Sequence, residues 1–280
     1  MNTYLKKRTY FCAMIFYYSG TGNTQWAASV LAKHLNERLL FIPHELKGDM
    51  HYTLSPGETV GFCFPVHGWQ PPHIVRKFVS AMQLHTTNEV PLTDYYTYTL
   101  VTCGDSVGLT TKIFQKILAN KGLCLHGHYD LVMPESYVCL PFMYTDTPEK
   151  EHRKIAQATI DLKQIICNIQ QHRVCLQPSH PGALPKTYSH VIGAFFNKYM
   201  ITDKPFRVDE EKCIGCGKCA ETCSVANIAI GECSTPEFKH TGECTCCLSC
   251  YHHCPTHAIN YGRITKKRGQ YYFGRTSMNQ

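Results

Sequence analysis

The sequence lacks any run of about 18 uncharged apolar residues, so it contains no segment long enough to span a membrane as a helix. A shorter apolar stretch at residues 10–18 follows three basic residues, as in a signal sequence. It continues into Ser19-Gly20-Thr21-Gly22 without a cleavage site of small residues. We therefore interpret this stretch as a strand, and we expect no membrane insertion and a cytoplasmic location.

Charged residues are also scarce, at 18% of the 280-residue chain, while hydrophobic residues make up 44%. This balance excludes a globally disordered chain and supplies enough apolar side chains for a core. The length fits one domain of about 170 residues together with a smaller one. We therefore expect a folded protein with two domains.

Short β-type runs alternate with helical patterns from residue 10 to about residue 172, an arrangement typical of a parallel α/β sheet. The predicted strands lie at 11–17, 39–42, 59–64, 96–102 and 129–133. The predicted helices lie at 24–38, around 74–82, from a cap at Asp105 or Ser106 to Gly122, and at 148–171. The pattern predicts a doubly wound, five-stranded parallel sheet.

Four prolines between residues 173 and 206 interrupt this pattern and indicate a domain boundary. Residues 191–201 nevertheless place apolar side chains at near-helical spacing, so we expect a short helix docked between the domains. The expected segments are a sheet domain at 1–172, a linker with this helix at 173–206, a cysteine-rich domain at 207–265 and a basic tail at 266–280.

The chain contains 17 cysteines, and eight of them lie in its last third at the spacing of metal ligands. They form two identical runs 31 residues apart: Cys213, Cys216, Cys219 and Cys223, then Cys244, Cys247, Cys250 and Cys254. Such clustering in a long chain indicates a reducing compartment rather than a disulfide scaffold. The constant offset implies two copies of one structural unit.

Three thiolates separated by two residues each can bind three corners of one 4Fe-4S cluster, while the fourth points elsewhere. In two-cluster ferredoxins the fourth thiolate of each run binds the other cluster. We therefore assign Cys254 to the cluster of the first run and Cys223 to the cluster of the second run. Zinc is the alternative occupant. Because zinc needs only four ligands per ion, the duplicated set of eight favours two 4Fe-4S clusters. Cys246 lies out of register and is not assigned as a ligand.

The runs read Cys-Ile-Gly-Cys-Gly-Lys-Cys-Ala-Glu-Thr-Cys and Cys-Thr-Cys-Cys-Leu-Ser-Cys-Tyr-His-His-Cys-Pro. Over about residues 207–262 this pattern resembles the bacterial two-cluster 4Fe-4S ferredoxins. That family usually has proline after the fourth cysteine of each run, and here Pro255 keeps it while Ser224 replaces it. The replacement removes no ligand. The resemblance implies a small α+β ferredoxin-like domain with two clusters.

The first predicted strand ends in a loop rich in hydroxyl groups and glycine. The loop consists of Ser19, Gly20, Thr21, Gly22, Asn23 and Thr24. Hydroxyls can donate to phosphate oxygens, glycines let the backbone approach closely, and the helix that follows favours an anion at its N-terminus. The loop matches neither the Gly-x-x-x-x-Gly-Lys nor the Gly-x-Gly-x-x-Gly nucleotide pattern. It is therefore a candidate site for a phosphate group.

Two further loops follow the third and fourth predicted strands. They consist of Pro65, Val66, His67, Gly68 and Trp69, and of Cys103, Gly104 and Asp105. Together the three loops resemble the FMN site of flavodoxins, whose parallel sheet has the strand order 2-1-3-4-5. The resemblance implies bound FMN, with Trp69 stacked on the flavin ring. A role of Trp69 as an interface aromatic is the alternative.

From about residue 10 to residue 265 the chain resembles the flavodoxin–ferredoxin fusion proteins of anaerobic bacteria. The resemblance implies an electron-transfer protein that passes electrons between two 4Fe-4S clusters and FMN, and on to a redox protein partner. One alternative is a flavin-dependent reductase of a small molecule, fed by its own ferredoxin domain. Another is a regulator that senses oxygen or iron. The sequence leaves the donor, the acceptor and the oligomeric state open.

The formal net charge of the chain is +7 before cofactors are counted. Each cluster with its thiolates carries roughly −2 and a flavin phosphate about −2, which leaves roughly +1 for the loaded protein. We therefore expect no nucleic-acid partner. The basic residues at 266–268, with Arg263 and Arg275, form either a solvated tail or a weak partner site.

Overall fold

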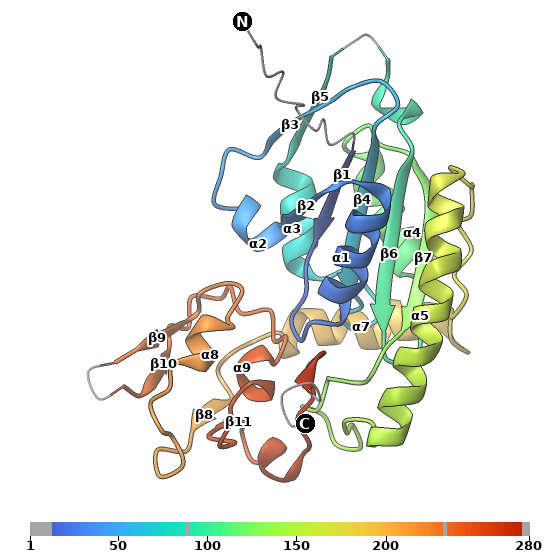
Figure 1. Ribbon diagram of the computed structural model, residues 1–280. Coiled ribbons are helices and arrows are strands. Elements are labelled where there is room, and N and C mark those ends of the chain that lie inside the picture. Colours follow the sequence, from blue (N-terminus) through green and yellow to red (C-terminus); the bar gives the residue numbers. More distant parts are fainter. Residues whose placement is uncertain (1–12, 88–89, 232–233, 276–280) are drawn as a thin grey trace, which may run out of the picture.

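The computed structural model describes residues 13–87, 90–231 and 234–275 (Figure 1). Its central sheet contains β1 (Ala13–Tyr17), β2 (Arg38–Phe41), β4 (Thr59–Pro65), β6 (Thr97–Cys103) and β7 (Leu125–Val132). The spatial order is β2-β1-β4-β6-β7, and every pairing is parallel. In chain order this is 2-1-3-4-5, so the predicted flavodoxin-like fold class is confirmed.

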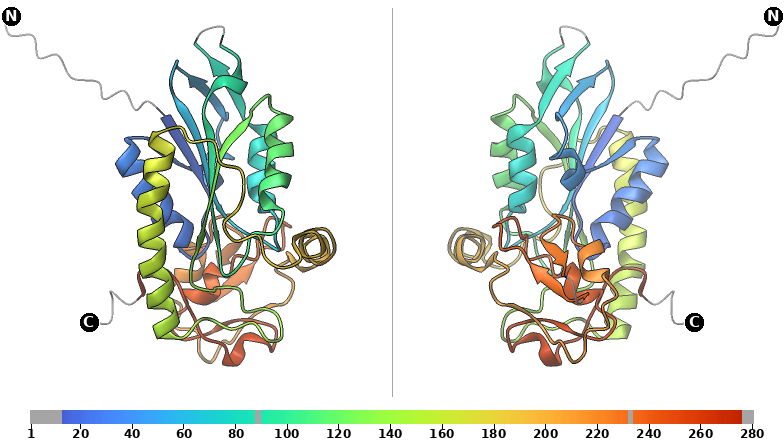
Figure 2. Two further views of the ribbon diagram at one scale, coloured as in Figure 1. Left: turned by 90° about the vertical axis from the view of Figure 1, so that its right-hand side faces the viewer. Right: turned by 90° about the vertical axis from the view of Figure 1, so that its left-hand side faces the viewer.

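Helices cover both faces of this sheet, as the edge-on views of Figure 2 show. One face carries α1 (Asn23–Leu35) and α5 (Pro148–Gln170), and the other carries α3 (His73–Ala81) and α4 (Thr110–Ala119). Parallel sheets need such cover because both faces of their strands are apolar. The five strands therefore bring their C-terminal loops to one protected edge.

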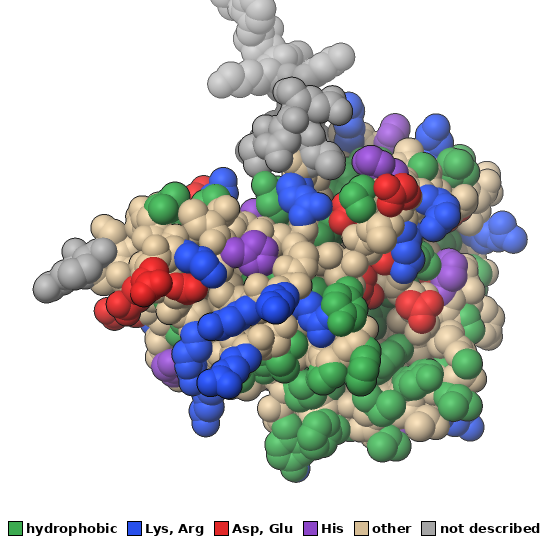
Figure 3. Space-filling model, turned by 90° about the horizontal axis from the view of Figure 1, so that it is seen from below, with side chains coloured by type: hydrophobic (Ala, Val, Ile, Leu, Met, Phe, Trp, Pro, Cys, Tyr) green, Lys and Arg blue, Asp and Glu red, His purple; other side chains and the backbone are tan. Residues whose placement is uncertain are grey.

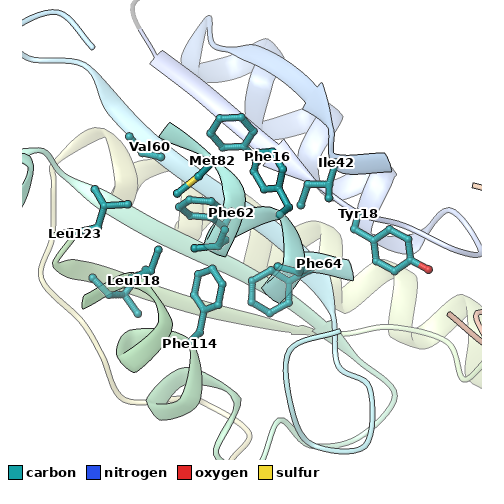
Figure 4. Packing of buried hydrophobic residues seen from close by; sticks show 14 of the residues in the cluster. Phe16, Tyr18, Ile42, Val60, Phe62, Phe64, Met82, Phe114, Leu118 and Leu123 are labelled. Carbon is teal, nitrogen blue, oxygen red and sulfur yellow. The ribbon is translucent and has the colours of Figure 1, made fainter. Parts of the chain in front are cut away.

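Strand geometry divides the apolar core into two clusters. Successive side chains of β1 point to opposite faces, so Phe16 packs with α3 and α4 while Ile15 packs with α1 and α5. On the first face, the ring of Phe114 lies 5.3 Å from that of Phe62 and 4.8 Å from that of Phe64, measured between centroids (Figure 4). This packing holds the sheet as a rigid frame for the loops.

Several details differ from the predicted elements. Helix α4 begins at Thr110 with Leu109 at its N-cap and no side-chain cap, so the predicted cap at Asp105 or Ser106 is wrong. The structure also contains short elements that the sequence pattern does not predict. Strands β3 (His51–Leu54) and β5 (Gln83–Thr86) form a parallel pair. Residues 42–45 form the helical turn α2 (Ile42–Glu45), and residues 92–94 form the 3-10 turn η1 (Leu92–Asp94).

Residues 185–200 form an almost continuous helical segment. It consists of α6 (Pro185–Thr187), η2 (Tyr188–Ile192), α7 (Gly193–Phe195) and η3 (Phe196–Met200), of which η2 and η3 are π-helical. Gly193 packs directly on the Gly68 carbonyl, where a larger residue would not fit. The helical segment thus lies against the loop that follows β4.

The cysteine-rich region is built from very short elements. They are β8 (Phe206–Val208), α8 (Lys218–Glu221), β9 (Ile228–Ile230), β10 (Pro236–Phe238), α9 (Ser249–His252), β11 (Ile259–Tyr261) and η4 (Thr265–Lys267). Strand β8 pairs antiparallel with β11, and β9 pairs antiparallel with β10. This small α+β unit lies below the C-terminal edge of the main sheet (Figure 1).

The lower face of the molecule carries both charged and apolar side chains (Figure 3). Lys and Arg side chains form a band across one half of this face, and hydrophobic side chains gather on the other half. Within the described ranges, no helix combines the length and the apolar character needed to cross a membrane.

Candidate functional site

A cavity of about 310 Å³ lies at the C-terminal edge of the main sheet. The predicted loops supply much of its wall: Ser19, Gly20, Thr21, Asn23, Thr24, Pro65, Val66, His67, Gly68, Trp69, Cys103, Gly104 and Asp105. Gly22 is the predicted loop residue that does not line the cavity. It has φ +94° and faces Phe273 instead. The strand order thus brings three loops, distant in sequence, to one cavity.

The first loop is held in shape by its own hydroxyls. Ser19 Oγ accepts a hydrogen bond from the Gly22 amide at 3.2 Å, and the hydroxyls of Thr24 and Thr102 hydrogen-bond at 2.7 Å. Asn23 and Thr24 are the first residues of α1, so their amides belong to the turn whose N–H groups have no partner within the helix. This arrangement suits an anion at the helix N-terminus.

The second loop carries an aromatic and a buried histidine. The Trp69 indole stacks on Tyr188 at 4.8 Å and donates to Ser106 Oγ at 3.1 Å. One face of the indole is therefore covered by the helical segment. Burial, reinforced by the charge of Arg76, lowers the pKa of His67 to about 4. His67 is thus neutral at neutral pH and can bind a proton only under acidic conditions.

The third loop contacts the carboxylate of Glu135, which the sequence pattern does not predict as a site residue. Glu135 packs against Gly104 so closely that a side chain at position 104 would collide with it. Burial raises the pKa of Glu135, although the Tyr137 amide donates to its Oε1 at 3.2 Å. Lys154 donates to the Gly104 carbonyl at 2.8 Å and fixes the loop from outside.

Two more groups of cavity residues were not predicted. The first group comes from the loop after β7 and its continuation: Met133, Pro134, Glu135, Ser136, Tyr137, Leu140 and Met143. The second group comes from the helical segment: Ile192, Phe195, Phe196 and Met200. The first group follows the fifth strand, so the strand-end reasoning used for the other loops would also have found it. For the second group, the near-helical apolar spacing at 191–201 predicts a docked helix, but it does not indicate that this helix lines the cavity.

The two cysteine runs fold alike, as their repeat predicts. Helices α8 and α9 are related by the offset of 31 residues seen in the sequence. Left-handed backbone recurs at equivalent positions, at Gly215 and Cys246 and at Gly217 and Leu248. The amides of Asn227 and Ala258 donate to the sulfurs of Cys223 and Cys254, both at 3.2 Å.

Two of the buried thiols have neighbours from both cysteine runs. Cys219 lies within electrostatic range of Cys216 and Cys254, whereas Cys250 has Cys244, Cys247 and Cys223 as its neighbours. Burial raises the pKa values of Cys219, Cys223, Cys244 and Cys250. Thiolates at these positions therefore need a cation or a metal cluster to stabilise their charge.

No three His, Cys, Asp or Glu side chains of the described residues converge as the ligands of a single metal ion would. A 4Fe-4S cluster binds each thiolate to a different iron, so its ligands do not need to converge on one point. Cys246 hydrogen-bonds the Cys139 thiol within the apolar core of the region. Its thiol is thus paired with a cysteine outside the two runs.

The second cysteine run adjoins the first loop. Cys246 and Cys247 line the cavity, and a Cβ atom added to Gly20 would lie 2.6 Å from the Cβ of Cys247. Tyr18, which is fully buried, hydrogen-bonds Thr245 Oγ1 at 2.6 Å. These contacts join the sheet and the cysteine-rich region at the cavity itself.

Residues 205–229, which contain the first cysteine run, match the 4Fe-4S binding domain family. No curated protein gives a match to the chain. A protein of Bacteroides uniformis provisionally named a flavoprotein shares 15% identity, with 42% of this chain and 88% of that chain covered and a TM-score of 0.31. The Trp repressor binding protein of Bacillus subtilis shares 12% identity, with 54% and 98% covered and a TM-score of 0.32.

Proposed function

We propose that this chain is an electron-transfer protein that binds two 4Fe-4S clusters and FMN and passes electrons between them and a redox protein. One cluster would be held by Cys213, Cys216, Cys219 and Cys254, and the other by Cys244, Cys247, Cys250 and Cys223. The clusters would supply single electrons, while the flavin can exchange one or two. The chain would therefore connect one-electron and two-electron partners.

The cysteine-rich region fits two clusters in its backbone as well as in its ligands. The amide hydrogen bonds to Cys223 and Cys254 stabilise negative charge on these sulfurs. The main-chain turn of each run repeats, with Gly217 and Leu248 both left-handed before the short helix that carries the third cysteine. Family similarity over residues 205–229 supports the first run directly.

The cavity supports FMN as its ligand because three loops at the strand ends enclose it. Side chains at Gly20, Gly68 or Gly104 would collide with Cys247, Phe196 or Glu135 respectively, so these glycines let the neighbouring segments pack closely around the cavity. The first loop offers the α1 amides and a Ser19 hydroxyl whose proton is still free to be donated. Neutral His67 and Trp69 line the part of the cavity expected for the ring.

The contact between Gly20 and Cys247 carries this proposal. Cys247, a proposed ligand of the second run, lies against the loop proposed for the flavin phosphate. The first run lies further out, because Cys216 is exposed and the neighbouring Ile214 is 65% exposed. We infer that a protein donor docks near Ile214, and that electrons reach the cavity through the second run.

A small-molecule reductase is the second candidate, favoured by apolar residues in the cavity wall. Leu140, Met143 and Phe195 are among the apolar residues that line the cavity, and Glu135 lines it too. A raised pKa makes Glu135 a better proton donor near neutral pH than an ordinary carboxyl group. Such a site could take an apolar electron acceptor beside the flavin ring.

The test is cofactor analysis after anaerobic reconstitution. We expect about eight iron atoms and eight acid-labile sulfides per chain, together with one FMN and no FAD. Replacing Thr24 with leucine should strongly weaken FMN binding and leave the iron content unchanged, since the new side chain crowds the phosphate loop. Zinc in place of iron, or equal flavin content in Thr24→Leu and the parent, would contradict the proposal.

A further inference from the structure

The segment that follows η4 does not extend away from the protein. Residues 268–275, which we name the C-terminal strap, run from α9 to the first cavity loop, and Tyr271 within it is only 2% exposed. Composition alone had assigned these residues to a basic tail. Their contacts instead place them between the second cysteine run and the proposed phosphate site.

At one end the strap fixes the phosphate loop. Tyr271 donates its hydroxyl to Asn23 Oδ1 at 2.6 Å, and the Asn23 amide group donates to the Pro134 carbonyl at 3.1 Å. Both ends of the Asn23 side chain are therefore occupied, and the side chain is committed to positioning the loop. Its backbone amide remains at the start of α1, facing the place of the phosphate.

The next residues of the strap close over the same loop. The Phe273 amide donates to the Thr21 carbonyl at 2.8 Å, and its ring stacks on Trp26 at 5.1 Å. Phe273 also faces Gly22, whose φ of +94° only glycine adopts without strain. An uncommon backbone conformation is thus stabilised by a residue about 250 positions away in sequence.

At its other end the strap contacts the second cysteine run. The Gln270 side-chain amide donates to the carbonyls of Tyr251 and Cys254, at 2.6 and 2.8 Å. The Tyr251 hydroxyl, fully buried, donates to the carbonyls of Arg268 and Gly269 at 2.8 and 3.0 Å. The strap therefore depends on the backbone around Cys254, which a bound cluster would order.

We propose that the strap is part of the FMN site and couples flavin affinity to the cluster that Cys254 helps to hold. Tyr271 and Phe273 are its positioning residues, and Gln270 is the link to Cys254. The inference rests on the proposed function, since it requires that FMN and clusters bind. Because coupling between two binding equilibria is reciprocal, FMN should also slow the loss of this cluster.

The first experiment measures FMN binding to cluster-loaded protein by quenching of flavin fluorescence. Tyr271→Phe should raise the dissociation constant about tenfold, since it leaves the Oδ1 of Asn23 without its buried partner. Tyr272→Phe is the matched control, because Tyr272 is the next residue and stacks on His253 instead of contacting the loop. Absorbance near 400 nm should be unchanged in both variants, so that lost clusters do not explain the result.

The second experiment tests the coupling. Cys254→Ala, which removes a ligand of one cluster only, should weaken FMN binding by about tenfold, and by much less when Gln270→Ala has already broken the link. Equal FMN affinity in Tyr271→Phe and Tyr272→Phe, or an equal effect of Cys254→Ala with and without Gln270→Ala, would overturn the inference. If neither the parent nor Thr24→Leu binds FMN, both the inference about the strap and the proposed function fail.

Discussion

The two regions of this chain are stabilised by different means. The sheet region has two apolar clusters, with fully buried side chains such as Phe62, Phe114 and Leu31 contributed by strands and helices throughout it. The cysteine-rich region has strands of three residues and helices of four, and its buried core includes Cys219, Cys250 and Cys254. If these cysteines hold the proposed clusters, this core is incomplete without the metal.

The largest expected effect therefore comes from removing the clusters. Chelation under anaerobic conditions should unfold the cysteine-rich region and leave the sheet folded, because only the former depends on metal. Hydrogen exchange is the measurement. Amides of residues 206–261 should lose protection, whereas those of β4 and β6 should keep it. Loss of protection in both regions together would show that they are one cooperative unit.

A substitution in the apolar core tests the stability of the sheet region. Phe114→Ala should destabilise it by about 3–5 kcal/mol, since the ring is fully buried among other aromatic side chains. Ile160→Ala is the control, because the Ile160 side chain is 61% exposed. Denaturant unfolding should show that this control changes the free energy of unfolding by about 0.5 kcal/mol or less.

A smaller effect concerns the pH dependence of the sheet. Burial lowers the pKa of His128 to about 4, against the opposing influence of Asp130, while its Nδ1 hydrogen-bonds Thr99 at 2.9 Å. The unfolded state, with an ordinary pKa near 6.5, then binds a proton that the folded state does not. Stability should fall as the pH decreases from about 6.5 to about 4.

The matched variant for this effect is His128→Asn, which keeps a hydrogen-bonding group near Nδ1 but cannot be protonated. Its loss of stability between pH 7 and pH 5 should be smaller than that of the parent by about 1–2 kcal/mol. Denaturant midpoints across this pH range provide the measurement. An identical pH profile in the two proteins would show that His128 is not the titrating group.

The periodicity of the sequence was sufficient to predict the central sheet, but not the short strands and the helix cap described above. The five strands follow from apolar runs that alternate with helical patterns, whereas their order came from the resemblance to flavodoxins. The pairing of β3 with β5 was missed because each strand has only four residues, partly polar and exposed. The cap of α4 was misassigned because Asp105 and Ser106 belong to the cavity loop, and the helix begins at Thr110 with Leu109 at its N-cap.

Residue spacing was sufficient for the cysteine repeat and for the three loops that line the cavity. It could not reveal the strap, because a tyrosine at position 271 gives no sign that its partner is Asn23, 248 residues earlier. The same holds for Glu135, whose contact with Gly104 depends on how two strand ends meet. Contacts of this kind are fixed by tertiary packing, which local patterns do not encode.

The central claim is that the second cysteine run delivers electrons to the cavity. Stopped-flow mixing of FMN-loaded protein with a reduced, low-potential one-electron donor tests it most directly, with EPR identifying the cluster that survives in each variant. With a small-molecule donor, which can reduce either cluster without docking near Ile214, Cys213→Ala should retain flavin reduction, whereas Cys223→Ala, which removes a proposed ligand of the run beside Gly20, should lose most of its rate. Equal rates of flavin reduction in Cys223→Ala and the parent would contradict the account.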